Sequence, residues 1–257
     1  MKAYFTIDCE RDIRTSGYKG IINGIPCLLE ILTKHNVKAT FFVTGEVIKN
    51  YPKIVKKIAD EGHEVGLHGY SHKRFDSMNL EEKENEIKHS VEAYKKLFKQ
   101  TPRGFRAPQH SIDSETIKIL EKYGLRYDSS VCSWNLMLLR HLFRKDSKKI
   151  EIIKNFFGKS KIYKIGKFAE VPRSSPGLAL GGFELKVYPK WLILLILNMH
   201  RLFGIPINFV MHSWDMVNIK GSRTSEHCNS NKFEKRLEWL IEKIKERNKF
   251  TRIEAAI

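Results

Sequence analysis

The sequence has few of the residues that mark small secreted or irregular proteins. Among 257 residues there are only 4 cysteines and 8 prolines, and Cys9, Cys27, Cys132 and Cys228 form no CxxC pair. Because this scatter fits neither a disulfide framework nor a zinc-knuckle spacing, we expect reduced thiols. The 42% share of hydrophobic residues excludes a mainly disordered chain.

Long hydrophobic runs are also missing. The longest, residues 191–197 (WLILLIL), is far shorter than the roughly 20 residues that cross a bilayer. It is interpreted as a helix packed in the core, and the alternative is a helix in peripheral contact with a membrane. The first residues are too weakly apolar for a signal peptide, so we expect a cytoplasmic protein.

Negative charge is scarce compared with positive charge. There are 46 Lys plus Arg against 29 Asp plus Glu, which gives a formal net charge of +17. A positive field concentrates polyanions near a surface, but it does not identify a particular ligand. The lysines are interleaved with glutamates along predicted helix faces, and no nucleic-acid motif accompanies them, so we expect no specific nucleic-acid partner.

Short apolar runs alternate with amphipathic helical patterns along residues 1–257, without a linker or a repeat. This alternation predicts a single α/β domain with parallel strands, because helices usually bridge parallel strands. With about seven such units, we expect a distorted (β/α) barrel whose functional residues lie at the carboxyl ends of its strands. Residues 131–165 give no readable pattern. The predicted strands are residues 3–7, 38–43, 63–68, a short strand that ends at 105–106, and residues 125–128, 168–171, 208–211 and 251–253.

Four polar clusters fall at predicted strand ends. They are Asp8-Cys9-Glu10, His68-Gly69-Tyr70-Ser71-His72, Arg106-Ala107-Pro108 and His212-Ser213-Trp214. Side chains two apart on a strand share a face, so Asp8 and Glu10 project together while Cys9 turns to the other side. A pair of carboxylates at one point needs a cation.

The two histidines of the second cluster can bind such a cation. Imidazoles four residues apart can converge on one ion, and imidazole with carboxylate suits zinc or a neighbouring first-row metal. Histidine pairs also occur on solvated loops, which is the alternative. Two histidines and one carboxylate leave positions open for water and substrate, as in catalytic sites. Asp12 is a rival to Glu10 as the acidic ligand.

The order and content of these clusters resembles the polysaccharide deacetylase family, the NodB-homology domain of carbohydrate esterase family four, in a subgroup with an Asp-x-Glu first motif. The resemblance extends over nearly the whole chain. The sequence departs from the family pattern at Cys9, Gly69 and Gln109, where the family usually has an aspartate, a hydroxyl residue and an aromatic. The matching segments are Thr6-Ile7-Asp8-Cys9-Glu10, His68 to His72, Arg106-Ala107-Pro108-Gln109, Tyr127-Asp128-Ser129-Ser130, Glu170-Val171-Pro172 and Val210-Met211-His212.

The resemblance implies a role for each matching residue. Asp8 would be the general base, and His212 the general acid that protonates the departing amine. Glu10, His68 and His72 would hold one divalent metal ion, with zinc as the expected ion.

The residues around this centre receive supporting roles. Arg106 would keep Asp8 ionised, because an adjacent cation favours a carboxylate. Trp214 would stack on a sugar face or pack at the strand end, and Pro108 would also contact substrate. Asp128 is interpreted as a residue that tunes His212 or caps a turn. Asp215 is interpreted as a surface acid, and the alternative is a residue that orients a neighbour.

The resemblance implies a metal-dependent hydrolase that removes an N-acetyl group from an amino sugar. The positive surface and the apolar run at residues 191–197 favour a lipid-linked or nucleotide-linked glycan precursor. Two alternatives remain open. One is hydrolysis of another amide, as in deformylases or allantoinases, and the other is a non-catalytic carbohydrate or polyanion-binding module.

Overall fold

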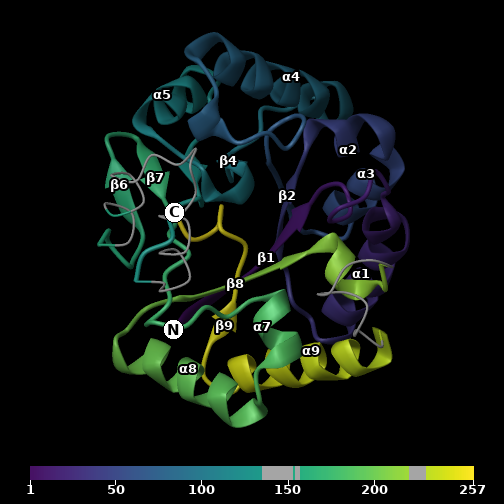
Figure 1. Cartoon of the computed structure of the whole chain (residues 1–257), viewed down its shortest axis with the longest axis vertical. Coiled ribbons are helices and arrows are strands. Elements are labelled where there is room, and N and C mark those ends of the chain that lie inside the picture. Colours follow the sequence, from purple (N-terminus) through teal and green to yellow (C-terminus); the bar gives the residue numbers. More distant parts are fainter. Residues whose placement is uncertain (135–152, 154–156, 220–229) are drawn as a thin grey trace.

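A single curled sheet with helices around it forms the centre of the molecule (Figure 1). A computed structural model of the chain describes residues 1–134, 153, 157–219 and 230–257. Much of the unreadable stretch 131–165 therefore lies outside the described residues, as does Cys228. The other three cysteines are free, as expected.

The strand order confirms the predicted fold class. The sheet runs β6-β7-β5-β4-β3-β2-β1-β8, with β9 beside β1, and only β6 pairs in antiparallel fashion. Seven consecutive parallel strands, from β7 to β8, thus form the distorted barrel. The strands are β1 Lys2–Cys9, β2 Thr40–Val43, β3 Glu64–Leu67, β4 Gly104–Phe105, β5 Tyr127–Asp128, β6 Tyr163–Ile165, β7 Phe168–Glu170, β8 Ile207–His212 and β9 Lys249–Phe250.

The last strand lies earlier than predicted. A strand was expected at residues 251–253, but β9 covers Lys249–Phe250. Thr251 still donates its N–H to the carbonyl of Ala3 at 3.0 Å. The chain then leaves the sheet, because the N–H of Ile253 binds the side-chain oxygen of Thr40 rather than a strand backbone.

The longer helices follow the predicted apolar periodicity. α4 begins with a reciprocal cap, since the Asn79 side chain accepts from the Glu82 N–H at 3.0 Å and the Asn79 N–H donates to the Glu82 carboxylate at 2.9 Å. α2 and α7, six residues each, were not predicted because so short a helix shows no 3.6-residue period. The helices are α1 Ile25–Lys34, α2 Gly45–Asn50, α3 Pro52–Asp60, α4 Leu80–Phe98, α5 Ser114–Lys122, α7 Gly182–Val187, α8 Lys190–Leu202 and α9 Ser230–Lys245. Among the described residues, no helix combines the length and apolar character that a bilayer span requires.

Alternation along β1 separates two environments. Phe5, Ile7 and Cys9 belong to the main hydrophobic core, with residues of the covering helices. Tyr4 belongs to a second, smaller cluster with Phe42 of β2 and residues of β5 and β7. Because side chains alternate along a strand, Asp8 follows Tyr4 onto the inner side of the curled sheet.

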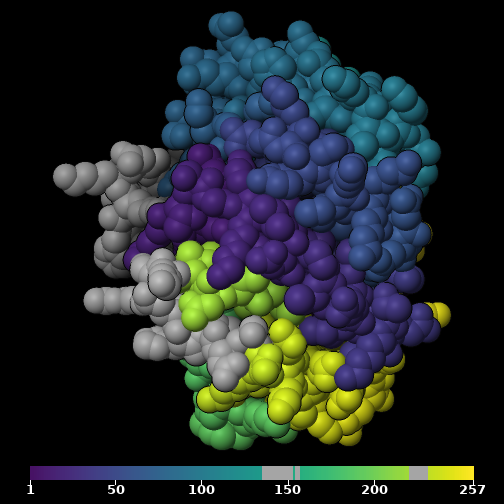
Figure 2. All heavy atoms as spheres, turned by 90° about the vertical axis from the view of Figure 1, so that its right-hand side faces the viewer, coloured from purple at the N-terminus to yellow at the C-terminus, as the bar shows by residue number. Residues whose placement is uncertain are grey.

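Close packing fixes the segment that follows β8. A Cβ atom on Gly20 would lie only 2.5 Å from the backbone nitrogen of Trp214, so this contact requires glycine. In Figure 2 the segment after β8 (light green) lies between the N-terminal part of the chain (purple) and α9 (yellow). The residues that follow β8 are thereby held against those that precede α1.

Candidate active site

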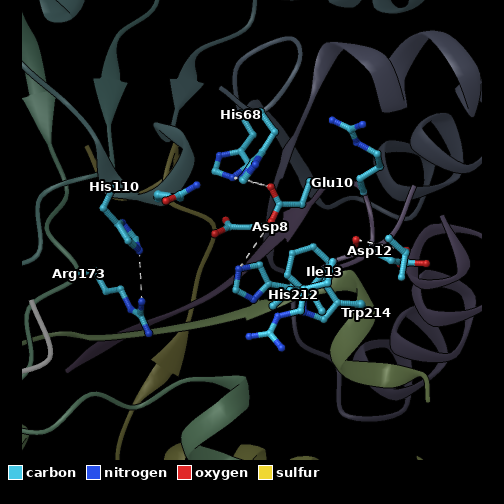
Figure 3. Close-up of a pocket in the computed structure, with 14 residues that line it drawn as sticks. Asp8, Glu10, Asp12, Ile13, His68, His110, Arg173, His212 and Trp214 are labelled. Carbon is cyan, nitrogen blue, oxygen red and sulfur yellow. Dashed lines mark hydrogen bonds and ion pairs between the residues drawn. The ribbon is translucent and has the colours of Figure 1, made fainter. Parts of the chain in front are cut away.

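A cavity of about 770 Å³ opens at the carboxyl ends of β1, β3 and β8 (Figure 3). Such strand ends are where functional residues gather in parallel α/β folds. The lining residues are Asp8, Glu10, Arg11, Asp12, Ile13, Arg14, Thr15, His68, His72, Gln109, His110, Arg173, His212 and Trp214.

Glu10, His68 and His72 converge at this cavity. One ligand atom from each lies within 4.8 Å of the other two. The His68 Nε2 is 3.6 Å from the Glu10 Oε2, and His72 Nε2 contacts the same oxygen. That oxygen is buried without a hydrogen-bond partner in the described part of the chain. A buried carboxylate oxygen between two imidazole nitrogens fits a divalent metal ion, and the donor set suits zinc.

Hydrogen bonds outside this cluster orient both histidines. His68 Nδ1 lies 2.7 Å from the carbonyl of Arg106, so Nδ1 donates and Nε2 keeps its lone pair toward Glu10. The loop before His72 is tethered to α4, where the Glu86 carboxylate accepts from the N–H groups of Tyr70 and Ser71 at 2.8 and 3.0 Å. Ser71 also donates its hydroxyl to Glu86 at 2.6 Å, which replaces the hydroxyl absent at position 69 as a support for the loop.

Asp8 lies beside a fully buried arginine. Arg106 Nη1 donates to the Asp8 Oδ1 at 2.9 Å and to the Thr6 hydroxyl at 3.0 Å, and Arg106 Nε donates to the carbonyl of Ser129 at 2.9 Å. Burial opposes ionisation of Asp8, but Arg106 and the neighbouring His68 outweigh it, so the pKa of Asp8 lies well below its usual range. Asp8 is therefore a carboxylate with a fixed orientation.

His212 closes the site from β8. Its Nε2 lies 3.9 Å from Glu10 Oε1, and its ring stacks on Trp214 with centroids 4.3 Å apart. The Asp215 carboxylate accepts the His212 backbone N–H at 2.8 Å and lies 3.7 Å from Nδ1. Burial lowers the pKa of His212, but Asp215 more than offsets this, and the net direction is upward.

The interpretation of Asp215 as a surface acid is wrong, and its contacts with His212 fit the alternative of a residue that orients a neighbour. Its side chain is only 5% exposed and forms an ion pair of 2.6 Å with Lys186 of α7. Gly182 leaves the room for this carboxylate, because a Cβ at that position would overlap it. The sequence carried no sign of this arrangement, since Lys186 is distant along the chain and α7 is too short to predict.

His110 and Arg173 also line the cavity and were not predicted as site residues. Arg173 Nη1 lies 3.3 Å from His110 Nε2, and the pair faces Asp8 across from Glu10 and Trp214 (Figure 3). A guanidinium has only donors, so this ring nitrogen must be an unprotonated acceptor. Burial, and then the charge of Arg173, lowers the pKa of His110 well below its usual value. The only sequence signal was the short distance of His110 from Arg106.

Three of the predicted site residues, Pro108, Asp12 and Asp128, make contacts other than those predicted. Pro108 is buried and does not line the cavity, because it begins the tight turn that presents Gln109 and His110. Asp12 lines the cavity but accepts the backbone N–H groups of Lys19 and Gly20 at 2.6 and 2.8 Å, which occupies both its oxygens.

Asp128 contacts Ser130 and pairs with Glu170, and no contact joins it to His212 in the described structure. Its first proposed role, tuning His212, is therefore wrong. Ser130 Oγ donates to Asp128 at 2.6 Å and accepts from the Ala107 N–H at 2.7 Å. Asp128 thus holds the segment that carries Arg106.

The fold and this site together define a class: an α/β barrel with a His-His-carboxylate cluster next to a buried acid–arginine pair. Residues 18–127 match the model of the polysaccharide deacetylase family, so this part of the chain is similar to that family. A peptidoglycan deacetylase from Helicobacter pylori is 37% identical over 124 residues, which are 48% of this chain and 42% of that protein. Chitin deacetylase 1 from Saccharomyces cerevisiae is 32% identical over 139 residues, 53% of this chain and 46% of that protein. The match thus spans less than half the length of these relatives.

Solved structures agree on the fold. A Mycobacterium smegmatis protein provisionally described as a polysaccharide deacetylase superposes with a TM-score of 0.66 at 21% identity, covering 95% of this chain and 83% of that chain. A mutant of a CE4-family pseudoenzyme, described as having restored enzymatic activity, has a TM-score of 0.59 at 20% identity. The superposition covers 99% of this chain and 66% of that chain. Because the fold is shared with a pseudoenzyme, activity has to be argued from the site residues.

Proposed function

We propose that this protein is a metal-dependent hydrolase that removes an N-acetyl group from an amino sugar. The observation that carries the proposal is the placement of three groups on one cavity. These are the Glu10–His68–His72 cluster, the Asp8–Arg106 pair and His212. The deacetylase names of the relatives support the same chemistry.

Glu10, His68 and His72 would hold a divalent ion, which would supply Lewis acidity toward an amide carbonyl and the attacking water. The residues of the chain have separate tasks. Asp8, kept ionised by Arg106, accepts a proton from the attacking water. His212 delivers a proton to the amine nitrogen as the C–N bond breaks, so that acetate and a free amine leave. Trp214 forms a wall of the cavity against which a sugar ring can stack.

Metal analysis and acetate release test the proposal together. We expect one zinc ion per chain and acetate release from N-acetylglucosamine oligomers or a linked N-acetyl sugar. The double variant His68→Ala/His72→Ala should lose both the ion and turnover, because imidazoles supply two of three donors. The control His89→Ala changes an exposed histidine of α4 and should retain both. A full complement of bound metal without turnover on any amide would support a non-catalytic binder instead.

Removing the Asp215 charge should shift the pH profile. His212 acts as an acid only while protonated, so activity falls as the pH rises through its pKa. Asp215 raises that pKa. Asp215→Asn should therefore move the alkaline limb of kcat to lower pH by about one unit, the usual effect of losing a neighbouring charge. If the alkaline limb of kcat does not move, His212 is not the general acid. The control is Asp60→Asn, which changes an exposed aspartate and should leave the profile unchanged.

The finer substrate proposal is a glycan precursor linked to a lipid or nucleotide phosphate. Arg11, Arg14 and Arg173 line the cavity, and no ion pair joins any of them to a carboxylate in the described part of the chain. Uncompensated arginines favour an anionic group next to the sugar. This proposal includes a cytoplasmic location, where such precursors are made.

Substrate pairs that differ only in charge test this point. We expect kcat/KM for UDP-N-acetylglucosamine or a prenyl-phosphate-linked N-acetyl sugar to exceed that of the uncharged methyl glycoside by about tenfold or more, the effect of one charge-assisted contact. Arg173→Ala should reduce turnover of the charged substrate more than turnover of the methyl glycoside. Equal rates on charged and uncharged partners would contradict the proposal, and faster formate than acetate release would favour a deformylase.

A further inference from the structure

The outward side of α8 is apolar, which is unusual for a surface helix. Its inward residues Ile193, Ile196 and His200 are buried against the core. The outer stripe, which we define as Trp191, Leu194, Leu195 and Leu202, is exposed, with Trp191 67% and Leu202 79% accessible. Surface helices of soluble proteins normally present polar side chains on this side.

A basic groove lies at the start of this stripe. It has a volume of about 430 Å³, and none of the described residues that line it is acidic. Lys190, the first residue of α8, lies in the groove and packs its ammonium 4.8 Å from the ring centre of Trp239 in α9. α8 (green) and α9 (yellow) both lie at the bottom of Figure 1. The groove residues are Lys190, Asn231, Lys232, Lys235 and Arg236.

The groove carries charge that the protein does not neutralise. Among the described residues, no carboxylate forms an ion pair with Lys190, Lys232 or Lys235. Arg236 donates to the carbonyl of Tyr188, while its Nε is buried without a partner in the described structure. The groove therefore offers several donors and positive charges for a phosphate group.

We propose that the outer stripe and the basic groove together bind the surface of an anionic phospholipid membrane. Apolar side chains that include a tryptophan enter the boundary between headgroups and acyl chains, while adjacent lysines attract anionic headgroups. A second copy of the chain is a poor occupant, because both copies carry a formal net charge of +17. Nucleic acid would match the lysines but would leave the apolar stripe in water. This proposal does not depend on the catalytic one.

Vesicle sedimentation of the full chain tests the proposal. We expect binding to vesicles with 30% phosphatidylglycerol and at least tenfold weaker binding to pure phosphatidylcholine. The stripe variant Leu195→Glu/Leu202→Glu and the groove variant Lys232→Ala/Lys235→Ala should each weaken binding at least tenfold. Brominated lipid should quench the fluorescence of the wild type more than that of Trp191→Phe.

Control variants change exposed residues of the same kinds elsewhere. Leu80→Glu on α4, at a side chain 58% exposed, and Lys53→Ala/Lys56→Ala on α3 should bind like the wild type. Equal binding to neutral vesicles, or none to either, would overturn the proposal. Loss of self-association in the stripe variant on analytical ultracentrifugation would identify a dimer face instead. Phosphate binding that needs the lysines but not the stripe would identify a soluble ligand.

Discussion

Exchange of Asp8 for Asn is expected to lower kcat/KM for deacetylation by about 10²- to 10⁴-fold, the range for loss of a positioned general base. The Asn side chain keeps the size of Asp8 but cannot take a proton. The dissociation constant of the metal should stay within a few-fold of the wild-type value, because Asp8 is not one of the three clustered donors.

Stability must be measured in the same variant. Asp8→Asn leaves the buried Arg106 without its counter-charge, and breaking a buried pair costs about 3 to 5 kcal/mol. Activity is therefore compared at a temperature where circular dichroism shows the variant folded. If a folded, metal-loaded Asp8→Asn protein keeps wild-type turnover, Asp8 is not the base.

Exchange of Arg106 for Met is expected to have the largest effect on the fold. The Arg106 side chain is fully buried, contacts β1 and the segment after β5, and its guanidinium lies 4.3 Å from the ring centre of Phe42. We expect the free energy of unfolding to fall by about 3 to 5 kcal/mol, because the variant leaves a buried carboxylate unpaired. Chemical denaturation at pH 7 measures this loss.

The same exchange should change the pH dependence of activity. Burial alone raises the pKa of Asp8, and Arg106 is the main charge that lowers it. Without Arg106, Asp8 takes up its proton at higher pH, so the acidic limb of kcat/KM should move toward neutral pH. The control Arg103→Met changes an arginine in an exposed ion pair and should alter unfolding by less than about 1 kcal/mol. A stable Arg106→Met protein with an unchanged acidic limb would contradict this account.

The barrel could be predicted because its strands are apolar and regularly spaced. β1, β2 and β3 are buried on both sides, so their residues form mostly apolar runs that stand out from the amphipathic helices. The bounds of the two-residue strands β4 and β9 could not be predicted in the same way. Their ends depend on which backbone groups find partners across the sheet.

The central residues of the site could be predicted from their positions at strand ends, but the residues that surround them could not. Asp8 lies near the end of β1, Glu10 and His68 directly follow β1 and β3, and His72 is four residues further on, so topology brings all four to one edge. Arg173 and Lys186 reach the site through segments without a readable period, and Asp215 is buried only because Gly182 leaves room. Such contacts depend on packing between distant segments, which a single sequence does not reveal.

The burial of Arg106 limits how this enzyme candidate could be re-engineered. Its guanidinium joins the proposed proton acceptor to the interior of the barrel, so attempts to retune basicity would also disturb folding. Ile13, Arg14 and Gln109, by contrast, lie on short turns that line the cavity. In directed evolution toward new sugars, we therefore expect the selected substitutions to lie in those turns and not at Asp8 or Arg106.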